Sequence, residues 1–582
     1  MTVTLQGSPA SEGIAEGCAR TLVWRVPDVP HHTVAPDQLE AEVARFHRAL
    51  DEMRVRLEAL RKSTEERLGP VEARIFEPQL LMLQDELLVE GTVRYVRENR
   101  LSAARAFDLR TLELLAMWNR TEHPMVLDRL NDLQDLQVHL LHLLLDLPAP
   151  AVADPLDGPT ILIADDLTPS LTMRLDARQV VGIVTEKGTR TSHWAILARS
   201  LGIPAVVGAR GVLAAARAGT PVLIDGRTGR VVLAPTDPER RAFADRRGRL
   251  QAWQHELSSH VGLETISRDG ARIALRANLD LPGEAVLARR QGADGVGLFR
   301  TEFLVVGRSA MPDEEEQFEA YRQVVEAFEG RSVMLRIFDL GGDKFPLFLR
   351  MPAEENPFLG WRSVRVVLDR PDIFRPQIRA ILRAAALGDV RAMVPLVNTT
   401  AELVAVRRLF DEERQALEAR GVPVGPCPLG ALIETPAAAL HAAALARHAE
   451  FLSVGTNDLV QYTLAVDRTN ARLQQLYDPF HPAVVRQLHH VARVGRRGGR
   501  DVTVCGEFAG NPVGAFLLLG LGFTALSVAW PAVPELRSAI RAIDVGEATR
   551  SARRALAATD SRGVVEELVR SIGPAVDLSM FS

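Results

Sequence analysis

The sequence predicts an α/β protein: an N-terminal α/β domain with an inserted helical bundle, then a linker helix, then a C-terminal (β/α)8 barrel. Three observations lead to this fold class. Short apolar, strand-like segments stand on both sides of a long helical block. That block carries apolar residues at three- and four-residue spacing, which is typical of amphipathic helices. Beyond about residue 263, eight strand-like segments alternate with helical ones, as in a barrel of this type.

These observations divide the 582 residues into four parts, in keeping with the two or three domains expected of a chain this long. The expected parts are residues 1–25 with 148–236 (α/β domain), 26–147 (helical bundle), 237–262 (linker helix) and 263–582 (barrel). The linker is assigned as a solvated helix because its sequence is charged, rich in arginine and favourable to helix formation.

The α/β domain is expected to consist of short strands. Residues 1–25 contain strand-like segments separated by glycine turns, and strands return after the proline-rich joint at 147–150. The later strand-like segments are Thr160–Ala164, Val180–Thr185, Pro221–Asp225 and Val231–Leu233. For the helical block between the two sets, the sequence leaves two alternatives open: an insertion into this domain, or a separate helical domain.

The barrel is predicted from eight apolar segments. They are Arg272–Asn278, Gly295–Arg300, Val333–Asp339, Ala392–Val397, Gly430–Glu434, Phe451–Gly455, Val502–Glu507 and Leu526–Ala529. Polar residues lie at or just beyond the C-terminal ends of most of them, and in a (β/α)8 barrel that rim carries the active site. A doubly wound sheet is the alternative architecture.

Composition excludes several classes of protein. The chain is 47% apolar and 25% charged, which is ordinary for a globular protein, and its net charge of -5 gives no basis for binding nucleic acid or an anionic membrane. Its three cysteines are far apart and form neither a disulfide framework nor a metal pattern. The N-terminus has no secretory pattern, and the longest apolar run, 515–530, is too short to span a bilayer. We therefore expect a cytoplasmic protein with no membrane insertion.

A histidine lies at the predicted start of a helix that follows an apolar strand. Thr191 and Ser192 are natural N-cap residues, and the helix is expected to continue through Leu201. Because the first turn of a helix favours an anion, the imidazole of His193 is well placed to carry a phosphoryl group. The alternative is a capping turn with an incidental histidine. The flanking segment 188–208 favours the functional interpretation, since it resembles the phosphohistidine signature of the phosphoenolpyruvate-utilising enzymes.

Two carboxylates and a set of cations follow the barrel strands. Glu434 and Asp458 come after the fifth and sixth strands and suit Mg²⁺ holding a phosphorylated acid, although both are also typical of helix caps. Arginines suit the clamping of phosphate and carboxylate oxygens, and the argument depends on the set, because a single arginine is more often a surface residue. The cations are Arg300, Arg336, Arg362, Arg468 and Lys344. Cys505 ends the seventh strand, where a thiol serves either as a core residue or as a proton donor to carbon.

Together these motifs resemble the Enzyme I family of the bacterial phosphoenolpyruvate:sugar phosphotransferase system, over essentially the whole chain. Supporting segments are 13–15, 166–170 and 354–362. The resemblance implies that His193 is phosphorylated, with Thr168 and Arg190 beside it. It implies that phosphoenolpyruvate is bound by Arg300, Arg336, Arg362, Lys344, Asn457, Asp458 and Arg468. It also implies that Glu434 and Asp458 hold Mg²⁺, and that Cys505 protonates the enolate to give pyruvate.

The resemblance further implies that the helical block 26–147 docks the phosphocarrier protein HPr and that the barrel forms a homodimer. Three residues depart from the family pattern, namely Trp194, Gln134 and Trp530. An ATP-dependent pyruvate dikinase or phosphoenolpyruvate synthase is one alternative, but no phosphate-binding glycine loop precedes residue 150. A catalytically silent regulatory protein is the other, and the complete set of catalytic residue types disfavours it.

Overall fold

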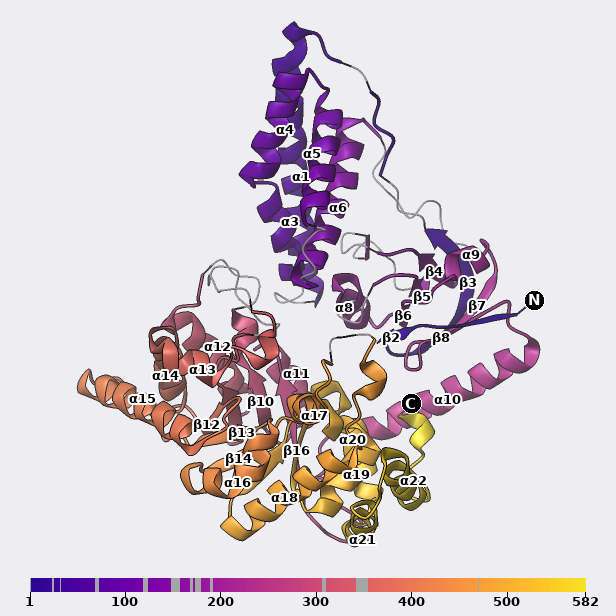
Figure 1. The fold of residues 1–582 in the computed structure, drawn as a ribbon. Helices are drawn as coiled ribbons and strands as arrows, with labels where there is room; N and C mark the ends of the chain where they lie inside the picture. Colours follow the sequence, from indigo (N-terminus) through magenta and orange to yellow (C-terminus); the bar gives the residue numbers. More distant parts are fainter. Residues whose placement is uncertain are drawn as a thin grey trace. The chain divides into compact units, whose positions relative to one another are not determined.

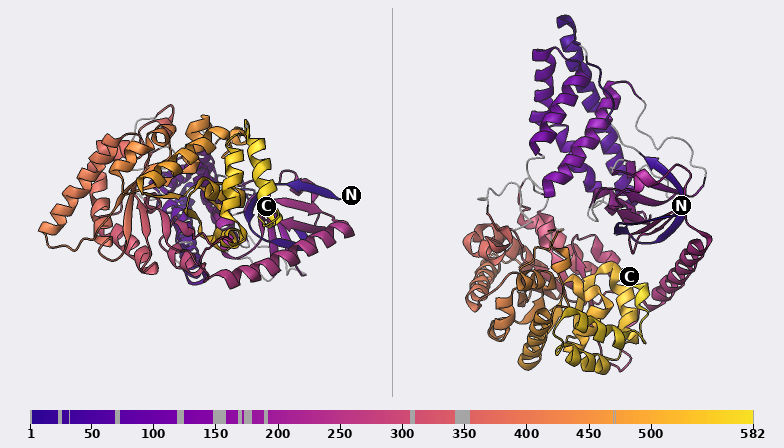
Figure 2. Two further views of the ribbon diagram at one scale, coloured as in Figure 1. Left: turned by 90° about the horizontal axis from the view of Figure 1, so that it is seen from below. Right: turned by 45° about the vertical axis from the view of Figure 1, so that its right-hand side comes forward.

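The structure is a computed structural model of the 582-residue chain. It describes residues 2–22, 26–31, 33–68, 73–118, 124–147, 158–167, 171–172, 179–188, 192–305, 310–341, 354–468, 470 and 472–581. Two compact units make up the chain, residues 1–251 and 252–581. The division falls within one continuous helix, α10 (Asp237–His260), which corresponds to the predicted linker (Figure 2).

The first unit contains an eight-stranded sheet with the order β1-β8-β7-β3-β4-β5-β6-β2 (Figure 1). Its strands are β1 (Val3–Gln6), β2 (Ser8–Ser11), β3 (Ile14–Leu22), β4 (Thr160–Ala164), β5 (Val180–Thr185), β6 (Ala205–Val207), β7 (Pro221–Asp225) and β8 (Arg230–Leu233). Strands β3 to β6 run parallel, and the remaining pairings are antiparallel.

One strand pairing decides between the two alternatives for the helical block. β3, which precedes the block, pairs in parallel with β4, which follows it, and Cys18 lies opposite Thr160. The helices are therefore an insertion into the α/β domain. The sequence prediction missed β6, which is only three residues long and completely buried. So short an apolar segment gives no periodicity from which a strand can be told from a loop.

The inserted block is a bundle of helices. Its members are α1 (Leu39–Leu68), α3 (Glu77–Met82), α4 (Glu86–Asn99), α5 (Ala103–Trp118) and α6 (Pro124–Leu144). The apolar stripe predicted along α1 faces inward: Val43, Phe46, Leu50, Met53 and Leu57 are all buried. They pack with residues of α4, α5 and α6 in a single hydrophobic core, which Leu197 also joins.

The second unit is a closed barrel of eight parallel strands (Figure 1). The strands are β9 (Ala274–Leu279), β10 (Val296–Arg300), β11 (Val333–Arg336), β12 (Val390–Val394), β13 (Leu429–Ile433), β14 (Phe451–Val454), β15 (Asp501–Val504) and β16 (Ala525–Ala529). Pairing of β16 with β9 closes the ring, with Ala525 opposite Ala274. This closure excludes the doubly wound sheet, and each predicted strand overlaps an observed one.

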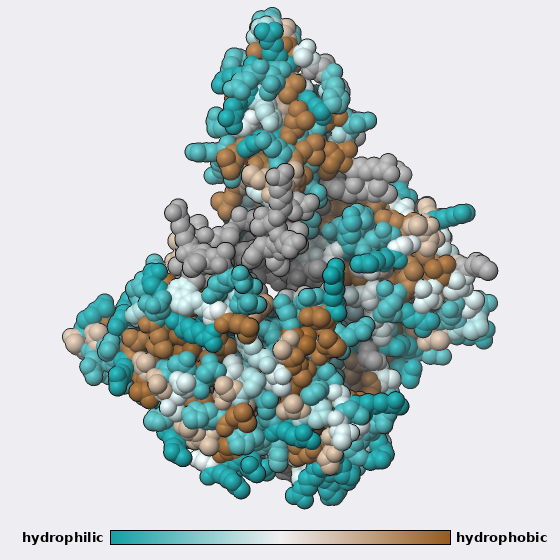
Figure 3. Space-filling view, in the orientation of Figure 1, coloured by the Kyte–Doolittle hydropathy of each residue, from teal (hydrophilic) through white to brown (hydrophobic). Residues whose placement is uncertain are grey.

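Helices follow the strands around the barrel. They are α11 (Glu284–Arg290), α12 (Glu314–Ala327), α13 (Val364–Asp369), α14 (Pro371–Ala384), α15 (Thr400–Ala419), α16 (Pro436–His448), α17 (Thr456–Leu464), α18 (Pro482–Gly498), α19 (Pro512–Leu521), α20 (Val533–Ala542), α21 (Val545–Ala555) and α22 (Ser561–Ile572). Their buried faces and the strands form one continuous core. Hydrophilic side chains cover most of the surface visible in Figure 3, with hydrophobic ones scattered among them. Across the described residues, every helix is too short or too polar to cross a bilayer.

Candidate active site

His193 is the first residue of a helix in the α/β domain. Strand β5 ends at Thr185, and α8 (His193–Ser200) begins after the N-cap residue Ser192. The predicted placement of His193 at a helix N-terminus, where the backbone N–H groups favour an anion, is therefore confirmed. The side chain of His193 lies outside the described part of the structure, as do the whole of Thr168 and Arg190.

The residue after the histidine points into the domain. Trp194 is buried, and its indole Nε1 donates a hydrogen bond to Asp166 Oδ1 at 3.0 Å. The same oxygen accepts from the backbone N–H of Leu167 at 2.8 Å. Burial raises the pKa of Asp166 above its ordinary value. Since its ring fills the interior of the α/β domain, Trp194 does not lie on a surface that a carrier protein could contact.

Two neighbouring turns are tied together beside this helix. Lys187 Nζ lies 2.8 Å from Asp165 Oδ2, which links the turn after β5 to the turn after β4. Gly188 has a φ of +94°, and a side chain there would come within 3.5 Å of Asp166 Oδ1, Ser192 Oγ and Trp194 Nε1. The positive φ of Gly188 is a backbone conformation that favours glycine, because glycine has no Cβ.

The barrel carries the second group of predicted residues at the C-terminal ends of its strands. Arg300 and Arg336 are the last residues of β10 and β11. Glu434 follows β13 directly, Asp458 lies in the first turn of α17, and Cys505 follows β15. The structure therefore brings these five residues to one mouth of the barrel, as the sequence predicted. Lys344 lies outside the described residues.

Buried ion pairs hold two of the arginines. Arg362 Nε and Nη2 lie 3.0 and 2.8 Å from the two carboxylate oxygens of Asp339, and its Nη atoms lie 3.3 Å from those of Asp458. Arg336 pairs with Glu302, and its Nη1 is 3.6 Å from Asp339 Oδ2. All five side chains are buried. Such pairs are rigid, because moving one partner leaves a buried charge without compensation.

Glu434 lies next to these buried ion pairs and is held in place by the surrounding backbone. Its Oε1 accepts the backbone N–H of Leu396 at 2.5 Å, and a side chain at Gly455 would come within 2.8 Å of its Oε2. Burial, together with the carboxylates of Asp458 and Asp339, raises the pKa of Glu434 to about 8. Burial also acts to raise the pKa of Asp458, but Arg362 and Arg468 outweigh it and the net shift is downward. Without a cation, Asp458 is ionised and Glu434 holds a proton at neutral pH.

The charges of the barrel mouth fit a divalent cation. Its buried carboxylates are those of Glu302, Asp339, Glu434 and Asp458. Two buried guanidinium groups, Arg336 and Arg362, oppose them, which leaves two negative charges in excess when all are ionised. Within the described residues there is no cluster of three or more metal-ligand side chains. Mg²⁺ is typically held by only one or two carboxylates, with water and substrate oxygens completing the shell. Glu434 and Asp458 therefore fit this ion.

Cys505 lies at the inner end of the mouth. Ser453 Oγ donates to its Sγ at 3.3 Å, and Sγ lies 3.6 Å from the carbonyl oxygen of Val454. The thiol packs against apolar side chains in the barrel interior, including Leu432 and Met334. Burial raises the pKa of Cys505, so the thiol stays protonated at neutral pH. A protonated thiol is the form that can donate to carbon.

The remaining predicted residues line the rim loops. Asn457 Oδ1 accepts the backbone N–H of Glu507 at 3.1 Å, and Tyr477 donates its hydroxyl to the carbonyl of Asn457 at 3.1 Å. The backbone N–H of Arg468 donates to Gln461 Oε1 at 3.1 Å, which anchors the loop after α17. The lowering effect of Arg468 on the pKa of Asp458 shows that its charge acts on the same group.

Sequence reasoning missed two side chains that shape this mouth. Glu302, two residues after Arg300, pairs with Arg336 and is completely buried. The hydroxyl oxygen of Tyr462 lies 3.2 Å from Arg362 Nη1. The same hydroxyl donates a hydrogen bond to the carbonyl oxygen of Phe358 at 2.5 Å. No sequence pattern marks either residue, because each acts through a partner far along the chain.

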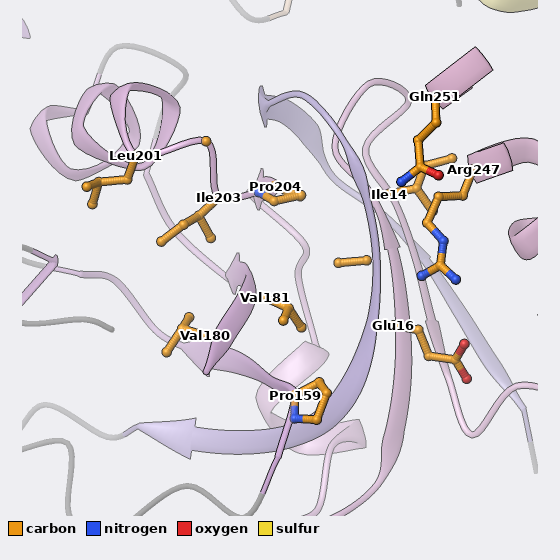
Figure 4. Close-up of a pocket in the computed structure, with 12 residues that line it drawn as sticks. Ile14, Glu16, Pro159, Val180, Val181, Leu201, Ile203, Pro204, Arg247 and Gln251 are labelled. Carbon is orange, nitrogen blue, oxygen red and sulfur yellow. The ribbon is translucent and has the colours of Figure 1, made fainter. Parts of the chain in front are cut away.

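A separate cleft of about 550 Å³ opens in the α/β domain (Figure 4). Its apolar wall includes Val181, Ile203 and Pro204, and its polar side includes Glu16 and Arg247. The cleft is lined by residues that follow the C-terminal end of α8, the end opposite His193. It is therefore no part of the predicted histidine site.

Comparison with known proteins agrees with this arrangement. The sequence matches "PEP-utilising enzyme, N-terminal" over residues 6–129, "PEP-utilising enzyme, mobile domain" over 156–229 and "PEP-utilising enzyme, PEP-binding domain" over 254–545. A phosphoenolpyruvate-protein phosphotransferase of Staphylococcus carnosus is 37% identical over 97% of this chain and 98% of its own length. One from Geobacillus stearothermophilus is 37% identical over 97% of both chains.

The insertion-bearing α/β domain followed by a barrel with a charged mouth is thus the architecture of a phosphoenolpyruvate-utilising enzyme, and the chain belongs to that family. Within it, the full-length likeness to the named relatives makes the chain a phosphoenolpyruvate-protein phosphotransferase, an enzyme of phosphoenolpyruvate-dependent phosphoryl transfer.

Proposed function

We propose that this enzyme transfers the phosphoryl group of phosphoenolpyruvate to His193 and from there to an HPr-type phosphocarrier protein, releasing pyruvate, as the first step of sugar uptake. The observation that carries the proposal is the buried charge group at the barrel mouth, built from Arg336, Arg362, Glu434 and Asp458. The position of His193 at the N-terminus of α8 supports its role as the acceptor.

Substrate binding in this proposal is the work of the rim cations. Phosphoenolpyruvate carries a phosphate and a carboxylate on three carbons, and guanidinium groups bind both kinds of oxygen through paired hydrogen bonds. Arg300, Arg336, Arg362, Arg468 and Lys344 supply the positive charge, and Asn457 a polar contact. Because Arg336 and Arg362 are fixed by buried carboxylates, they are oriented before the substrate arrives, which favours stabilisation of the charge that develops during transfer.

Glu434 and Asp458 are proposed to hold Mg²⁺, with the remaining ligands coming from water and substrate. When bound, the ion would neutralise phosphate charge and polarise the bridging oxygen. The excess of buried negative charge supports this assignment. Binding of the cation also requires Glu434 to give up its proton, since the ionised carboxylate is the ligand.

In this proposal His193 accepts the phosphoryl group and Cys505 supplies the proton. The neutral imidazole of His193 attacks phosphorus, the bond from phosphorus to the bridging oxygen breaks, and the enolate of pyruvate is left in the barrel. Cys505 then gives its proton to the methylene carbon of the enolate, which produces pyruvate and a thiolate. The thiolate recovers a proton from solvent. His193 and the barrel belong to different units, so the proposal requires the imidazole of His193 to reach the barrel mouth in every cycle.

The helical bundle within residues 26–147 is proposed as the docking surface for HPr, and the barrel as the homodimer interface. Several large apolar side chains are exposed on helices of the bundle, and these support a docking role. They are Val55, Leu81, Leu87, Leu112 and Met117. Exposed apolar side chains that lie together in one patch are commonly found where proteins bind one another.

Incubation of the purified enzyme with phosphoenolpyruvate and Mg²⁺ tests the proposal. We expect one pyruvate per polypeptide and an acid-labile phosphate that maps to His193 by mass spectrometry, followed by loss of the label on addition of HPr. Labelling from ATP in the absence of phosphoenolpyruvate would support the dikinase alternative instead. Failure to form pyruvate under any of these conditions would support the regulatory alternative.

A further inference from the structure

Arg300 differs from the other arginines of the barrel mouth in the carboxylate that it pairs with. Its Nη1 lies 3.1 and 3.5 Å from the two oxygens of Asp280, in the loop between β9 and α11. The carboxylate partners of Arg336 and Arg362 are buried, whereas the side chain of Asp280 is 37% exposed. Asp280 is thus a carboxylate that meets solvent at the entrance of the mouth.

The loop that carries Asp280 is itself held in place. Glu284, in the first turn of α11, accepts the backbone N–H groups of Asp280 and Leu281 on one carboxylate oxygen, at 2.7 and 3.1 Å. Its other oxygen lies 3.4 Å from the indole Nε1 of Trp530, at the end of β16. Glu284 therefore fixes the backbone that carries Asp280, so the carboxylate faces Arg300 not only because the two charges attract each other.

We propose that Asp280 is a resident counter-anion for Arg300, which phosphoenolpyruvate must displace, and that it thereby sets the affinity of the enzyme for this substrate. The inference rests on the proposed role of Arg300 in binding phosphoenolpyruvate. A carboxylate within hydrogen-bonding distance of Nη1 occupies this nitrogen, which is one of the donors available to the anionic substrate. It also places a negative charge where a substrate with several negative charges approaches.

Exposure makes this displacement feasible. A buried carboxylate cannot leave its arginine without a large penalty, whereas a partly exposed one exchanges its partner for water at little cost. Asp280 can therefore release Arg300 without disturbing the fold, while Glu302 and Asp339 cannot release theirs. The same argument predicts that removal of the Asp280 charge leaves the barrel stable.

The test is the steady-state kinetics of Asp280→Asn with phosphoenolpyruvate, Mg²⁺ and a saturating concentration of HPr as the phosphoryl acceptor. Loss of a partly exposed ion pair predicts a KM lowered about two- to fivefold, with kcat unchanged. The difference is expected to shrink at high ionic strength, because salt screens exposed charges. Asp280→Glu, which keeps the charge, should retain a KM close to that of the wild type.

Asp389→Asn is the matched control. Asp389 forms a similar partly exposed pair with Arg391 at 3.2 Å, but at the N-terminal end of β12, away from the mouth. Its KM should not change. An unchanged or higher KM in Asp280→Asn, in an enzyme that still turns over phosphoenolpyruvate, would overturn the inference, and a lower kcat with it would show that Asp280 orients Arg300. If the wild-type enzyme forms no pyruvate at all, the proposed function itself fails.

Discussion

Individual side chains in the barrel mouth are arranged so that buried charges compensate one another. Arg362 lies between Asp339 and Asp458, and Arg336 between Glu302 and Asp339. Replacement of one member would expose its partner to an apolar surrounding without an opposite charge, which typically costs about 3–5 kcal/mol. These residues therefore stabilise the mouth, and in the proposed function they also present oriented groups to the substrate.

Cys505→Ala should separate phosphoryl transfer from protonation of the enolate. The buried thiol is protonated at neutral pH because burial raises its pKa, so it can act as the acid, and its loss should slow exchange of the pyruvate methyl protons about a hundredfold or more. Proton NMR of pyruvate in D2O, with the phosphorylated enzyme and Mg²⁺, measures this exchange. Cys18→Ala, which removes an exposed thiol in the α/β domain, is the control. Equal exchange rates in the two variants would exclude Cys505 as the proton donor.

Trp194→Phe tests the bond between the histidine helix and the turn after β4. The substitution keeps an aromatic ring in the core but removes the N–H that Asp166 accepts, so the first unit should lose about 1–3 kcal/mol of unfolding free energy. Urea denaturation followed by circular dichroism measures the loss. In a double-mutant cycle, Trp194→Phe should cost clearly less when Asp166 is already Ala, because the indole N–H then has no acceptor at this position. Additive effects of the two substitutions would show that the bond contributes nothing.

For individual residues, the sequence predicted which of them lie at the barrel rim better than it predicted which side chains contact each other. Glu434, Asp458, Arg300 and Arg336 could be placed at one rim because strand ends are readable from apolar runs. The inward direction of Trp194 could not be predicted, because it depends on a contact with Asp166, 28 residues earlier in the chain.

The candidate site residues lie at the ends of strands and at the first turns of helices. Arg300 and Arg336 end their strands, whereas Glu434 directly follows β13, and Thr435 then caps α16 by accepting the N–H of Ala438. Apolar segments of four to seven residues predicted these strands well, because a barrel strand is buried on both faces. The pairing of β3 with β4 could not be predicted, because the sequence of the helical bundle between them does not indicate which strand the chain pairs with after the bundle.

Glu434 and Asp458 lie close together because they follow neighbouring strands, β13 and β14. The Glu434→Gln variant tests whether the Glu434 carboxylate titrates and binds Mg²⁺. The pKa of Glu434 is raised from about 4.5 to about 8 in the folded protein, so unfolding releases its proton between these values. The metal-free enzyme should therefore lose stability as pH rises from about 5 to 8, and Mg²⁺ should restore it by binding the ionised carboxylate.

The variant should lack both effects, because the amide neither ionises nor binds Mg²⁺ well. Thermal denaturation of both proteins at pH 5.5 and pH 8, with and without Mg²⁺, makes the comparison. If Mg²⁺ raised the Tm of the variant as much as that of the wild type at pH 8, Glu434 would not be a ligand.

The whole molecule consists of two units that share one helix. Within the first unit, the N-terminal half of α10 is fixed by the Arg240–Glu16 and Arg246–Asp225 ion pairs, at 3.0 and 3.3 Å. Within the second, Trp253 packs edge-on against Phe581 with ring centroids 5.1 Å apart. Each unit therefore holds its own end of the helix.

The His193→Ala variant tests most directly the central claim, which is that the phosphoryl group passes from phosphoenolpyruvate to HPr through His193. The enzyme variant is incubated with phosphoenolpyruvate, Mg²⁺ and HPr, and acid-labile phosphate is measured on both proteins. The variant should still bind phosphoenolpyruvate, because the barrel is a separate unit, but neither it nor HPr should become labelled and no pyruvate should form. Phosphorylation of HPr by the variant at the wild-type rate would contradict the account.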